Sequence, residues 1–456
     1  MAASARLDVP PCPFADVARL RGEPGVSEVL AQVLVRRGLA DPAAARAFLA
    51  GGAAHPPSAF AGLAEAVAVV SRHVAAGTRI TVHGDYDVDG ICSTAILVRC
   101  LQRLDADVDW HLPSRLDGGY GLSLDTVTAL AARGTGLLVT VDCAITAVKE
   151  VAAARAAGVD VVITDHHQPR ADGHLPDAPI VHPALGGYPC PDLCAAAVAA
   201  KLAEALEAAA GWEDEGVAGD LDLVALATVA DCVPLRGENR RLVREGVRAL
   251  AATGKPGLRA LMAVSSLDPG AVDARAVGFR LAPRINAAGR LDRADAGLEL
   301  VLTDDEERAG AIARELDDAN ARRRDVETRI LFAAEAQVSQ LPEQAAYVLA
   351  GDDWHRGVIG IVASRIAERH HRPVVMIALD GDSGTGSGRS IPAFDLLGGL
   401  NACAEYLTRH GGHRAAAGLE IERDRVPAFA RAFAEHAAAT LSADDLFHRG
   451  GTKSAD

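Results

Sequence analysis

The stretch that decides the fold is residues 137–167, LLVTVDCAITAVKEVAAARAAGVDVVITDHH. Two apolar runs rich in β-branched residues, LLVTV (137–141) and VDVVIT (159–164), flank an alanine-rich run of helical composition near 147–157. A strand, a helix and a second strand in this order form a βαβ unit, in which the two strands lie parallel in one sheet. Both runs end on acidic or histidine residues, so we expect polar side chains at one edge of that sheet.

The same alternation continues toward the N-terminus. There the sequence contains RITVH (79–83), a helical run near 90–104, VDWHL (108–112) and a second helical run near 123–133. Further along the chain, 195–210 and 221–250 are mostly helical in pattern, and 272–300 is an arginine-rich segment of loop and helix. We therefore predict an α/β fold built on a parallel, doubly wound sheet.

A second α/β region follows a long helical segment. Residues 304–340 contain no proline, and their apolar residues recur at helical spacing. YVLAG (347–351) and PVVMIAL (373–379) then restart a strand-and-helix pattern. The predicted organisation is a helical lead-in at 1–75, a larger α/β domain at 76–303, a connecting helix at 304–340, a smaller α/β domain at 341–440 and a flexible tail at 441–456.

Composition excludes several classes of protein. The chain has 456 residues, of which 49% are hydrophobic and 23% charged, so global disorder is excluded. A formal net charge of −15 argues against a protein that coats nucleic acid non-specifically, although carboxylates that bind cations leave a nucleic-acid enzyme open. The eight cysteines form no C-x-x-C pair, so we expect reduced thiols and no zinc knuckle. No apolar window spans a membrane and the N-terminus lacks a signal peptide, so we expect a cytoplasmic protein without a membrane partner.

Acidic and histidine residues gather where the predicted strands end. HGDYDVDG (83–90) follows the first strand, Asp142 follows LLVTV, and Asp165-His166-His167 follow VDVVIT. Asp231 comes after another apolar run, ALATVA. An isolated D-x-D-x-D would also suit a solvated turn or a calcium loop. Several such clusters at one sheet edge instead favour Mn²⁺ or Mg²⁺ and a two-metal hydrolase that acts on a phosphate ester.

These motifs resemble a known family. HGDYDVDG, TVDCAI, TDHHQP and TVADCVPL are similar to the four motifs of the DHH phosphoesterase superfamily. LPSRLDGGYGLS (112–123), GFRLAPRINAAGRLDRADAGLEL (278–300), GSGRS and GGHRAAAG narrow the resemblance to the RecJ family of bacterial exonucleases. The resemblance spans about residues 30–435 and implies a DHH catalytic domain joined by the long helix to a DHH-associated (DHHA1) domain.

The resemblance also implies an activity and partners. It implies a metal-dependent 5′-to-3′ exonuclease that hydrolyses single-stranded DNA to mononucleotides during DNA recombination and repair. A single-strand-binding protein and a helicase are the expected protein partners. Two other functions stay open from the residues: a DHH phosphodiesterase acting on short oligonucleotides or cyclic dinucleotides, and a non-catalytic DHH scaffold of a replication complex.

By the same resemblance, two divalent ions, Mn²⁺ or Mg²⁺, share one carboxylate. The residues expected at the first ion are Asp87, Asp142 and either His83 or Asp85, and those expected at the second are Asp89, Asp142, His166 and Asp231. His167 is expected to face the scissile phosphate or its leaving group. Asp165 is expected to orient a histidine rather than to bind a metal.

Nucleic-acid contacts are expected in two regions. The arginine-rich segment suits a groove wall that presents guanidinium groups to phosphates, although a solvated surface would give the same pattern. GTGSGRS (384–390) suits a loop that offers backbone N–H groups to an anion, and a flexible hairpin is the alternative. The predicted contacts are Tyr120, which would stack on a base or pack in the core, and Arg280, Arg284, Asn286, Arg290, Ser387, Arg389 and His413.

Two departures from the family pattern affect these expectations. Ala144 and the alanine-rich segment 195–200 stand where glycines are expected, so the local backbone could differ. RecJ-like chains usually continue into an oligonucleotide-binding β-barrel after the GGHRAAAG motif, and this sequence ends sooner. From that difference we expect frequent release of the DNA and distributive degradation.

Overall fold

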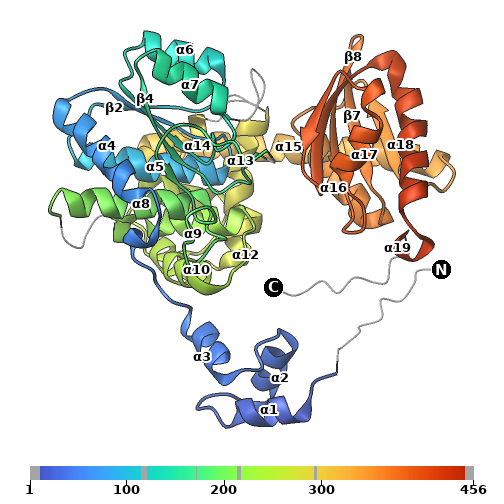
Figure 1. Ribbon diagram of the computed structural model, residues 1–456. Helices are drawn as coiled ribbons and strands as arrows, with labels where there is room; N and C mark the ends of the chain where they lie inside the picture. Colours follow the sequence, from blue (N-terminus) through green and yellow to red (C-terminus); the bar gives the residue numbers. More distant parts are fainter. Residues whose placement is uncertain (1–10, 114–120, 171, 213–216, 292–294, 447–456) are drawn as a thin grey trace. The chain divides into compact units, whose positions relative to one another are not determined.

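The computed structural model describes residues 11–113, 121–170, 172–212, 217–291 and 295–446 (Figure 1). Two compact units divide the chain, one built on Val9–Asn320 and the other on Ala321–Asp456. The long helix α15 (Glu306–Gln340) contains the boundary between them. The predicted α/β fold, with a parallel sheet before the long helix and a smaller α/β unit after it, is confirmed.

The first unit is built on a five-stranded parallel sheet in the order β2-β1-β3-β4-β5. Its strands are β1 (Ile80–His83), β2 (Val108–His111), β3 (Leu137–Val141), β4 (Asp160–Thr164) and β5 (Ile180–Val181). Every residue of β1 and β3 is buried, as expected when helices cover both faces of a parallel sheet. The two-residue strand β5 was not predicted from the sequence.

Helices form a layer on each face of this sheet. Helices α6 (Leu124–Ala132) and α7 (Val148–Ala156) pack on one face, against residues that include Leu138 and Val161 (Figure 1). The residues that alternate with these, such as Val139 and Val162, belong to the larger core formed with α5 (Val88–Arg103) and α8 (Ala195–Ala209). The central helix α5 therefore holds its N-terminus at the carboxyl edge of the sheet.

The lead-in is helical, as predicted, but it contributes to two cores. Helices α1 (Phe14–Arg21), α2 (Glu28–Arg36) and α3 (Pro42–Ala50) share a small cluster of their own. Helix α4 (Leu63–Ala76) instead buries Leu63, Ala66 and Val70 in the core of the sheet. The core of the first unit therefore begins before residue 76.

Helices complete the first unit after the sheet. Their bounds are α9 (Leu221–Ala230), α10 (Gly237–Ala251), α11 (Pro256–Val264), α12 (Ala274–Ala276), α13 (Ala282–Leu291) and α14 (Asp295–Leu302). Between α12 and α13 the chain forms a π-helical turn, η4 (Val277–Leu281). The prediction of loop within 272–300 is therefore wrong for 274–291, which are continuously helical.

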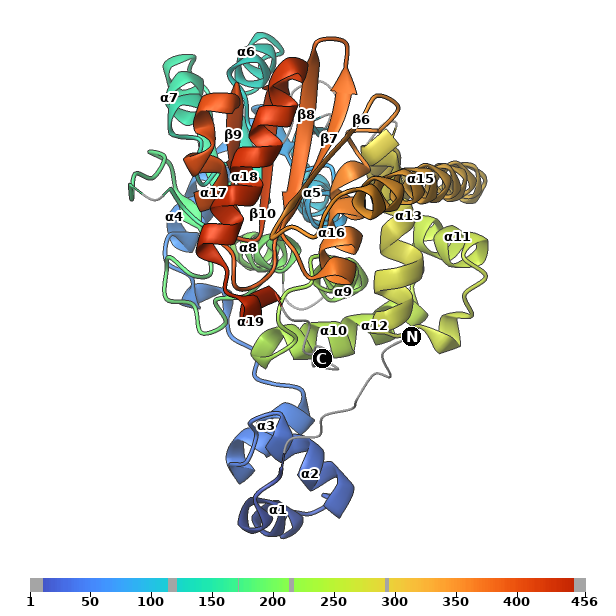
Figure 2. The same cartoon turned by 90° about the vertical axis from the view of Figure 1, so that its right-hand side faces the viewer.

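The second unit contains a mixed sheet in the order β6-β7-β8-β10-β9. Its elements are β6 (Tyr347–Gly351), α16 (Ile359–His370), β7 (Val374–Asp380), β8 (Ser383–Arg389), α17 (Leu396–Ala402), β9 (Arg409–Gly412), β10 (Ala416–Glu422), α18 (Val426–Thr440) and α19 (Ala443–Leu446). Only β6 and β7 pair in parallel, and the remaining pairs are antiparallel. Helices α17 and α18 lie together in front of this sheet in Figure 2, and their apolar residues form its core.

The glycine-rich segment of the second unit is a strand, so the predicted anion-binding loop is wrong. Its residues form β8, which pairs with β7 on one side and β10 on the other. Gly384, Gly386 and Gly388 all lie on one buried face, and a Cβ atom at Gly386 would lie 2.7 Å from Leu419 Cδ1. The glycines therefore allow close packing inside the sheet. GGHRAAAG, in contrast, forms the β9–β10 hairpin.

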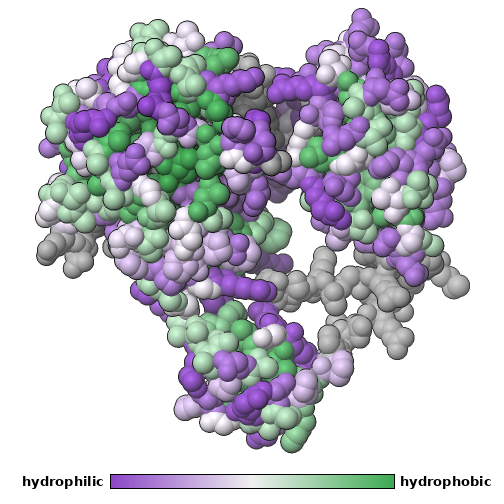
Figure 3. Space-filling model, in the orientation of Figure 1, coloured by the Kyte–Doolittle hydropathy of each residue, from purple (hydrophilic) through white to green (hydrophobic). Residues whose placement is uncertain are grey.

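Polar and apolar residues intermingle on the face of each unit seen in Figure 3. Among the helices of the described segments, none combines the length and apolar character that a bilayer span requires.

Candidate metal centre

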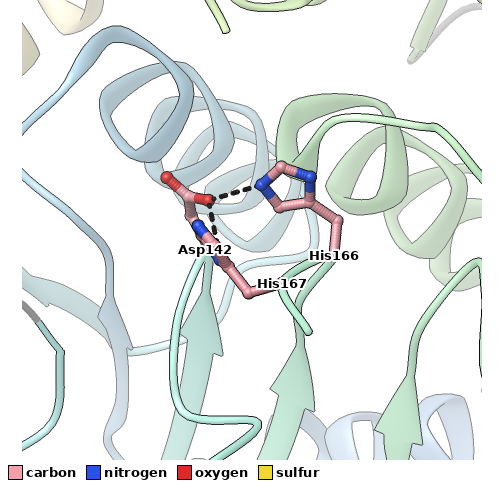
Figure 4. A group of neighbouring side chains, drawn as sticks. All are labelled: Asp142, His166 and His167. Atoms are coloured by element: carbon pink, nitrogen blue, oxygen red, sulfur yellow. Dashed lines mark ion pairs between the residues drawn. The ribbon is translucent and has the colours of Figure 1, made fainter. Parts of the chain in front are cut away.

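Five acidic or histidine-bearing positions meet at the carboxyl edge of the parallel sheet. Asp142 directly follows β3, and Asp165, His166 and His167 directly follow β4. Figure 4 shows the side chains of Asp142, His166 and His167 converging above the strand ends. Asp231 reaches the site from a different kind of element, because it caps the C-terminus of helix α9.

The loop between β1 and α5 is fixed by its own side chains. Asp87 caps α5, since its Oδ1 accepts hydrogen bonds from the backbone N–H groups of Asp89 (2.9 Å) and Gly90 (3.1 Å). A Cβ atom at Gly90 would lie 2.5 Å from the backbone N of Asp85, so only glycine allows the loop to fold back this closely. The loop thereby brings Asp85, Asp87 and Asp89 to the same edge as Asp142.

Asp89 is almost fully buried, with 2% of its surface exposed. Its two carboxylate oxygens accept hydrogen bonds, each of 2.8 Å, from the backbone N–H groups of Ala195 and Ala196 at the start of α8. The alanine-rich segment thus meets the site through its backbone. No residue of 195–200 has a positive φ, so alanine in place of glycine causes no strain there.

The backbone after β3 is strained. Asp142 has φ 62° and Ala144 has φ 80°, both in the left-handed region. Aspartate tolerates this conformation better than most residues, whereas the Cβ atom of alanine makes it unfavourable by roughly 1–2 kcal/mol. Ala144 thus has a backbone conformation that favours glycine, and whether the alanine changes the local geometry stays a prediction.

The side chains form three overlapping groups of potential metal ligands. The ligand atoms within each group lie within 4.8 Å of one another, and the groups are Asp85-Asp87-Asp142, Asp89-His166-Asp231 and Asp142-His166-His167. Asp142 belongs to two of these groups, and so does His166. The oxygen and imidazole donors, with no cysteine among them, suit hard or borderline divalent cations.

His83 lies beside these groups rather than in one. Its Nδ1 atom lies 3.1 Å from Nδ1 of His111, the neighbouring residue on β2. Burial, followed by the nearby His111, lowers the pKa of His83 to about 4. Of the two predicted alternatives for the first ion, the geometry of the described residues favours Asp85.

Burial and mutual repulsion dominate the electrostatics of the site. Burial and then the neighbouring carboxylates raise the pKa of Asp89 and of Asp142 well above the usual value, and they raise that of Asp231 to about 6. Burial, followed by the nearby His167, lowers the pKa of His166 to about 4. A divalent cation would reverse this repulsion.

The surroundings of one buried nitrogen atom, His166 Nε2, indicate whether a cation fits these ligand groups. His166 Nε2 is buried without a hydrogen bond among the described residues, and it lies 3.2 Å from Asp142 Oδ1 and 3.7 Å from Asp89 Oδ2. A neutral imidazole nitrogen that faces two carboxylates is a suitable metal ligand. The residues present therefore fit divalent cations.

Asp165 orients the histidine loop. Its Oδ1 accepts hydrogen bonds from the backbone N–H groups of His166 (2.7 Å) and His167 (3.0 Å) and lies 2.8 Å from His167 Nδ1. Its Oδ2 accepts from the backbone N–H of Ile145 (2.9 Å). Burial disfavours the charged carboxylate, but the hydrogen bonds from His167 and the backbone outweigh it and lower the pKa of Asp165.

Sequence reasoning missed His182, which directly follows β5 and is 2% exposed. Its Nδ1 atom accepts a hydrogen bond from the backbone N–H of Ala184 (3.1 Å), so its Nε2 carries the proton and donates to the carbonyl oxygen of His167 (2.8 Å). The signal was present, because His182 ends a strand of the same sheet. The strand is simply too short to recognise from the sequence.

Comparisons with known proteins agree with this architecture. The chain matches the N-terminal domain of the DHH family over residues 79–228 and the DHHA1 domain over residues 341–439. The single-stranded-DNA-specific exonuclease RecJ of Salmonella typhimurium is 40% identical over 406 residues, which are 83% of this chain and 70% of that protein. This chain belongs to the RecJ family.

Solved RecJ structures share the fold. The RecJ of Thermus thermophilus in complex with Mn²⁺ gives a TM-score of 0.84 at 36% identity, and the match covers 96% of this chain and 62% of that one. A manganese-bound exonuclease RecJ gives a TM-score of 0.75 at 39% identity, and the match covers 85% of this chain and 98% of that one. Bacillus subtilis RecJ is 37% identical over 92% of this chain, which spans only 54% of that RecJ's length.

Two of the arginines predicted to line a RecJ-like DNA groove are engaged within the protein. Arg280 donates hydrogen bonds to the carbonyl oxygens of Ser265 and Ser266, just after helix α11. Arg284 donates to Asp317 Oδ1 (2.9 Å) and to the carbonyl oxygen of Arg280 (2.5 Å). These bonds connect the segment to the end of α11 and to α15 within the first unit, and the predicted contact of both guanidinium groups with DNA stays a prediction.

Asn286 lies beside the metal centre. Its Oδ1 accepts a hydrogen bond of 3.1 Å from the backbone N–H of Val88, between Asp87 and Asp89. Arg290 lies one helical turn further along α13 and is half-buried. Tyr120 lies outside the described residues.

The remaining predicted contacts lie in the second unit. Ser387 and Arg389 are half-buried neighbours on β8, and Arg389 Nη1 donates to Ser387 Oγ (3.2 Å). Both face the start of α16, where a Cβ atom at Gly360 would lie 2.9 Å from Ser387 Oγ. Sequence reasoning did not single out Gly360. His413 is exposed at the turn of the β9–β10 hairpin.

Proposed function

We propose that this chain is a metal-dependent exonuclease that hydrolyses single-stranded DNA from the 5′ end to mononucleotides. The observation that carries the proposal is the set of three ligand groups linked through Asp142 and His166 at the sheet edge. Membership of the RecJ family supports the choice of substrate and direction. Neither the phosphodiesterase nor the scaffold alternative gains support from the relatives named above.

We propose that two divalent cations, Mn²⁺ or Mg²⁺, bind in this centre. Asp85, Asp87 and Asp142 would hold one, and Asp89, His166, Asp231 and Asp142 the other. Bound there, the cations would activate a water molecule and neutralise charge on the phosphate. The RecJ structures in complex with Mn²⁺ support the choice of ion.

His167 is proposed to act on the leaving group. Its Nδ1 is held by Asp165 at 2.8 Å, so Nε2 is the nitrogen that can face a phosphate. Burial lowers the pKa of His167, but the hydrogen bond and charge of Asp165 outweigh it, and the net shift is upward. In its protonated form His167 could donate a proton to the leaving oxygen.

The proposed division of labour follows the predicted domains. Residues 76–303 would carry catalysis, 304–340 would connect the domains, and 341–440 would hold the strand. The proposed DNA contacts among the described residues are Arg280, Arg284, Asn286, Arg290, Ser387, Arg389 and His413, of which Arg280 and Arg284 also bond within the protein. Proposed repair partners are a single-strand-binding protein and a helicase.

Digestion of end-labelled DNA tests this function. Single-stranded and blunt duplex oligonucleotides carrying a 5′ or a 3′ label are incubated with Mn²⁺, Mg²⁺ or EDTA. We expect only the single strand to be cut, with a 5′ label released at once as a mononucleotide and no cutting in EDTA. Cleavage restricted to dinucleotides or cyclic dinucleotides would contradict the proposal.

A further inference from the structure

The π-helical turn η4 carries a highly exposed aromatic ring. Phe279 is 80% exposed, although it lies in the middle of a continuous helical stretch. Such π-helical turns are rare and occur frequently at functional sites. Exposure alone does not imply a partner, since single apolar residues are common on protein surfaces, so any role depends on where this ring lies.

The turn lies next to the metal centre on the side of α9. A Cβ atom at Gly278 would lie 3.5 Å from Val229 Cγ1, so the turn passes against the last residues of α9. Asp231 caps that same helix end. At the other end of the segment, Asn286 accepts the backbone N–H of Val88. The helix that begins at this turn therefore leads from one side of the acidic site to the other.

One face of this helix is less buried than the other. Phe279, Pro283, Asn286 and Arg290 recur at spacings of four, three and four residues, and they are exposed or half-buried. The residues on the opposite side, Leu281, Ala282, Ile285 and Ala288, are buried. Seven residues of helix span about 10 Å, so the ring of Phe279 lies about that far along the helix from Asn286.

We propose that the ring of Phe279 stacks on a base of the single-stranded substrate, within a few nucleotides of the phosphodiester bond that is cut. This inference rests on the proposed nuclease function. Arg275, four residues earlier and exposed, lies on the same face and supplies positive charge for the adjoining phosphate. The ring and the cation together match a base and its phosphate.

A nucleic-acid base fits this ring better than a protein partner does. Protein docking requires a contiguous apolar patch, and among the described residues of 272–291 Phe279 is the one large apolar side chain that is strongly exposed. A single open ring beside a phosphodiester-cleaving centre instead resembles the aromatic platforms of single-strand binders.

The test compares first-cut kinetics on 5′-phosphorylated dT12 with Mn²⁺. A set of dT12 oligonucleotides, each with one abasic site at a position from 2 to 8, locates the stacked base. Variants Phe279→Ala and Phe279→Trp are compared with wild type. Phe332→Ala is the matched control, because Phe332 is 78% exposed on α15 and has no assigned role.

We expect Phe279→Ala to raise KM for dT12 by about 5- to 150-fold, the range that stacking of one base provides, with kcat changed less than about threefold. One abasic position should impair wild type and Phe279→Trp but leave Phe279→Ala unaffected, as a double-mutant cycle requires. Phe332→Ala should behave as wild type.

Different outcomes overturn different claims. A wild-type protein that fails to cut dT12 contradicts the nuclease function and this inference with it. A wild type that cuts, paired with Phe279→Ala of unchanged KM and abasic profile, overturns the stacking role alone. A change from dimer to monomer in sedimentation on Phe279→Ala would assign the ring to an interface between copies and would also overturn it.

Discussion

The acidic edge of the first sheet and the glycine strand of the second both look like functional loops in the sequence. HGDYDVDG is such a loop, in which the glycines let the chain fold back and the acidic side chains gather at the surface of the sheet. GTGSGRS is a strand, in which every second residue is a glycine pressed against leucine and isoleucine side chains. Similar composition therefore serves chemistry in one region and packing in the other.

The two regions also contribute oppositely to stability. The acidic edge buries carboxylates whose pKa values are raised by burial and repulsion, which is unfavourable for folding unless cations bind. The glycine strand pairs with β7 and β10 along its length and lets the core close over it. Substitutions in the first region should change activity, and substitutions in the second should change folding.

The largest expected effect is on activity at the acidic edge. Asp142→Asn keeps a residue that tolerates φ 62° but removes the charge shared by two ligand groups. We expect cleavage with Mn²⁺ to fall more than about 100-fold, equivalent to about 3 kcal/mol in the barrier. The melting temperature in EDTA should not fall. Asp125→Asn, at an exposed position on α6, is the control, and Asp142→Asn activity above about a tenth of wild type would contradict the shared-ligand assignment.

The next effect is on the stability of the glycine strand. Gly386→Val places a branched side chain where even a Cβ atom lies 2.7 Å from Leu419. We expect a loss of about 1–3 kcal/mol in the free energy of unfolding, measured by urea denaturation. Thr385→Val, the exposed neighbour on the opposite face, should change stability little. Equal stability of the two variants would refute the packing account.

An element can be predicted from the sequence when its own residues determine its structure. It is missed when its structure depends on contacts with residues distant in the sequence. Strands β1, β3 and β4 and the acids after them were predicted, because a buried parallel strand leaves an apolar run and the next residues reach the sheet edge. Strand β8 was missed, because glycine carries no apolar pattern and its neighbours β7 and β10 create the strand. Its identity depends on residues that follow it by some 30 positions.

The same distinction applies to the candidate site, where residues that depend on distant contacts were missed. His182 was missed because β5 has only two residues. The partners of Arg280 at Ser265 and Ser266, and that of Arg284 at Asp317, lie 14 to 33 positions away in the sequence. An arginine count gives the charge of a segment but not the direction of its side chains. The roles assigned to the ligand set stay predictions, and only the convergence of those side chains is seen in the fold.

The burial of Asp231 at the acidic edge should make the stability of the protein depend on pH. Asp231 has a pKa raised from 3.8 to about 6 in the folded protein, so folding favours its protonated form. Its stabilising contribution is therefore present below about pH 4 and is lost as pH rises through 6. In EDTA, Asp231→Asn should become more stable than wild type over this window, by on the order of 2 kcal/mol at pH 7.

Thermal melts of both proteins from pH 4 to pH 7 measure this difference. Addition of Mn²⁺ at pH 7 should raise the melting temperature of wild type more than that of Asp231→Asn. A difference independent of pH would show that Asp231 is not the group that repels its neighbours.

The smallest expected effect concerns the strained turn beside the acids. Ala144→Gly relieves a left-handed conformation, whereas Ala147→Gly removes a similarly buried methyl group at φ −85°. We expect Ala144→Gly to be the more stable of the two by about 1–2 kcal/mol in chemical denaturation. An equal cost for both glycines would mean that the turn relaxes without strain.

The two hydrogen bonds that Asp89 accepts from the start of α8 have a consequence for how tightly a cation is held. A free aspartate loses rotamer freedom when it becomes a ligand, and that loss weakens binding. The side chain of Asp89 is already immobilised by Ala195 and Ala196, so folding of the chain has absorbed that entropy before any ion arrives. The centre should therefore bind its cation with a smaller entropic loss than the same side chains would on a mobile loop, and helix α8 is the element that provides this advantage.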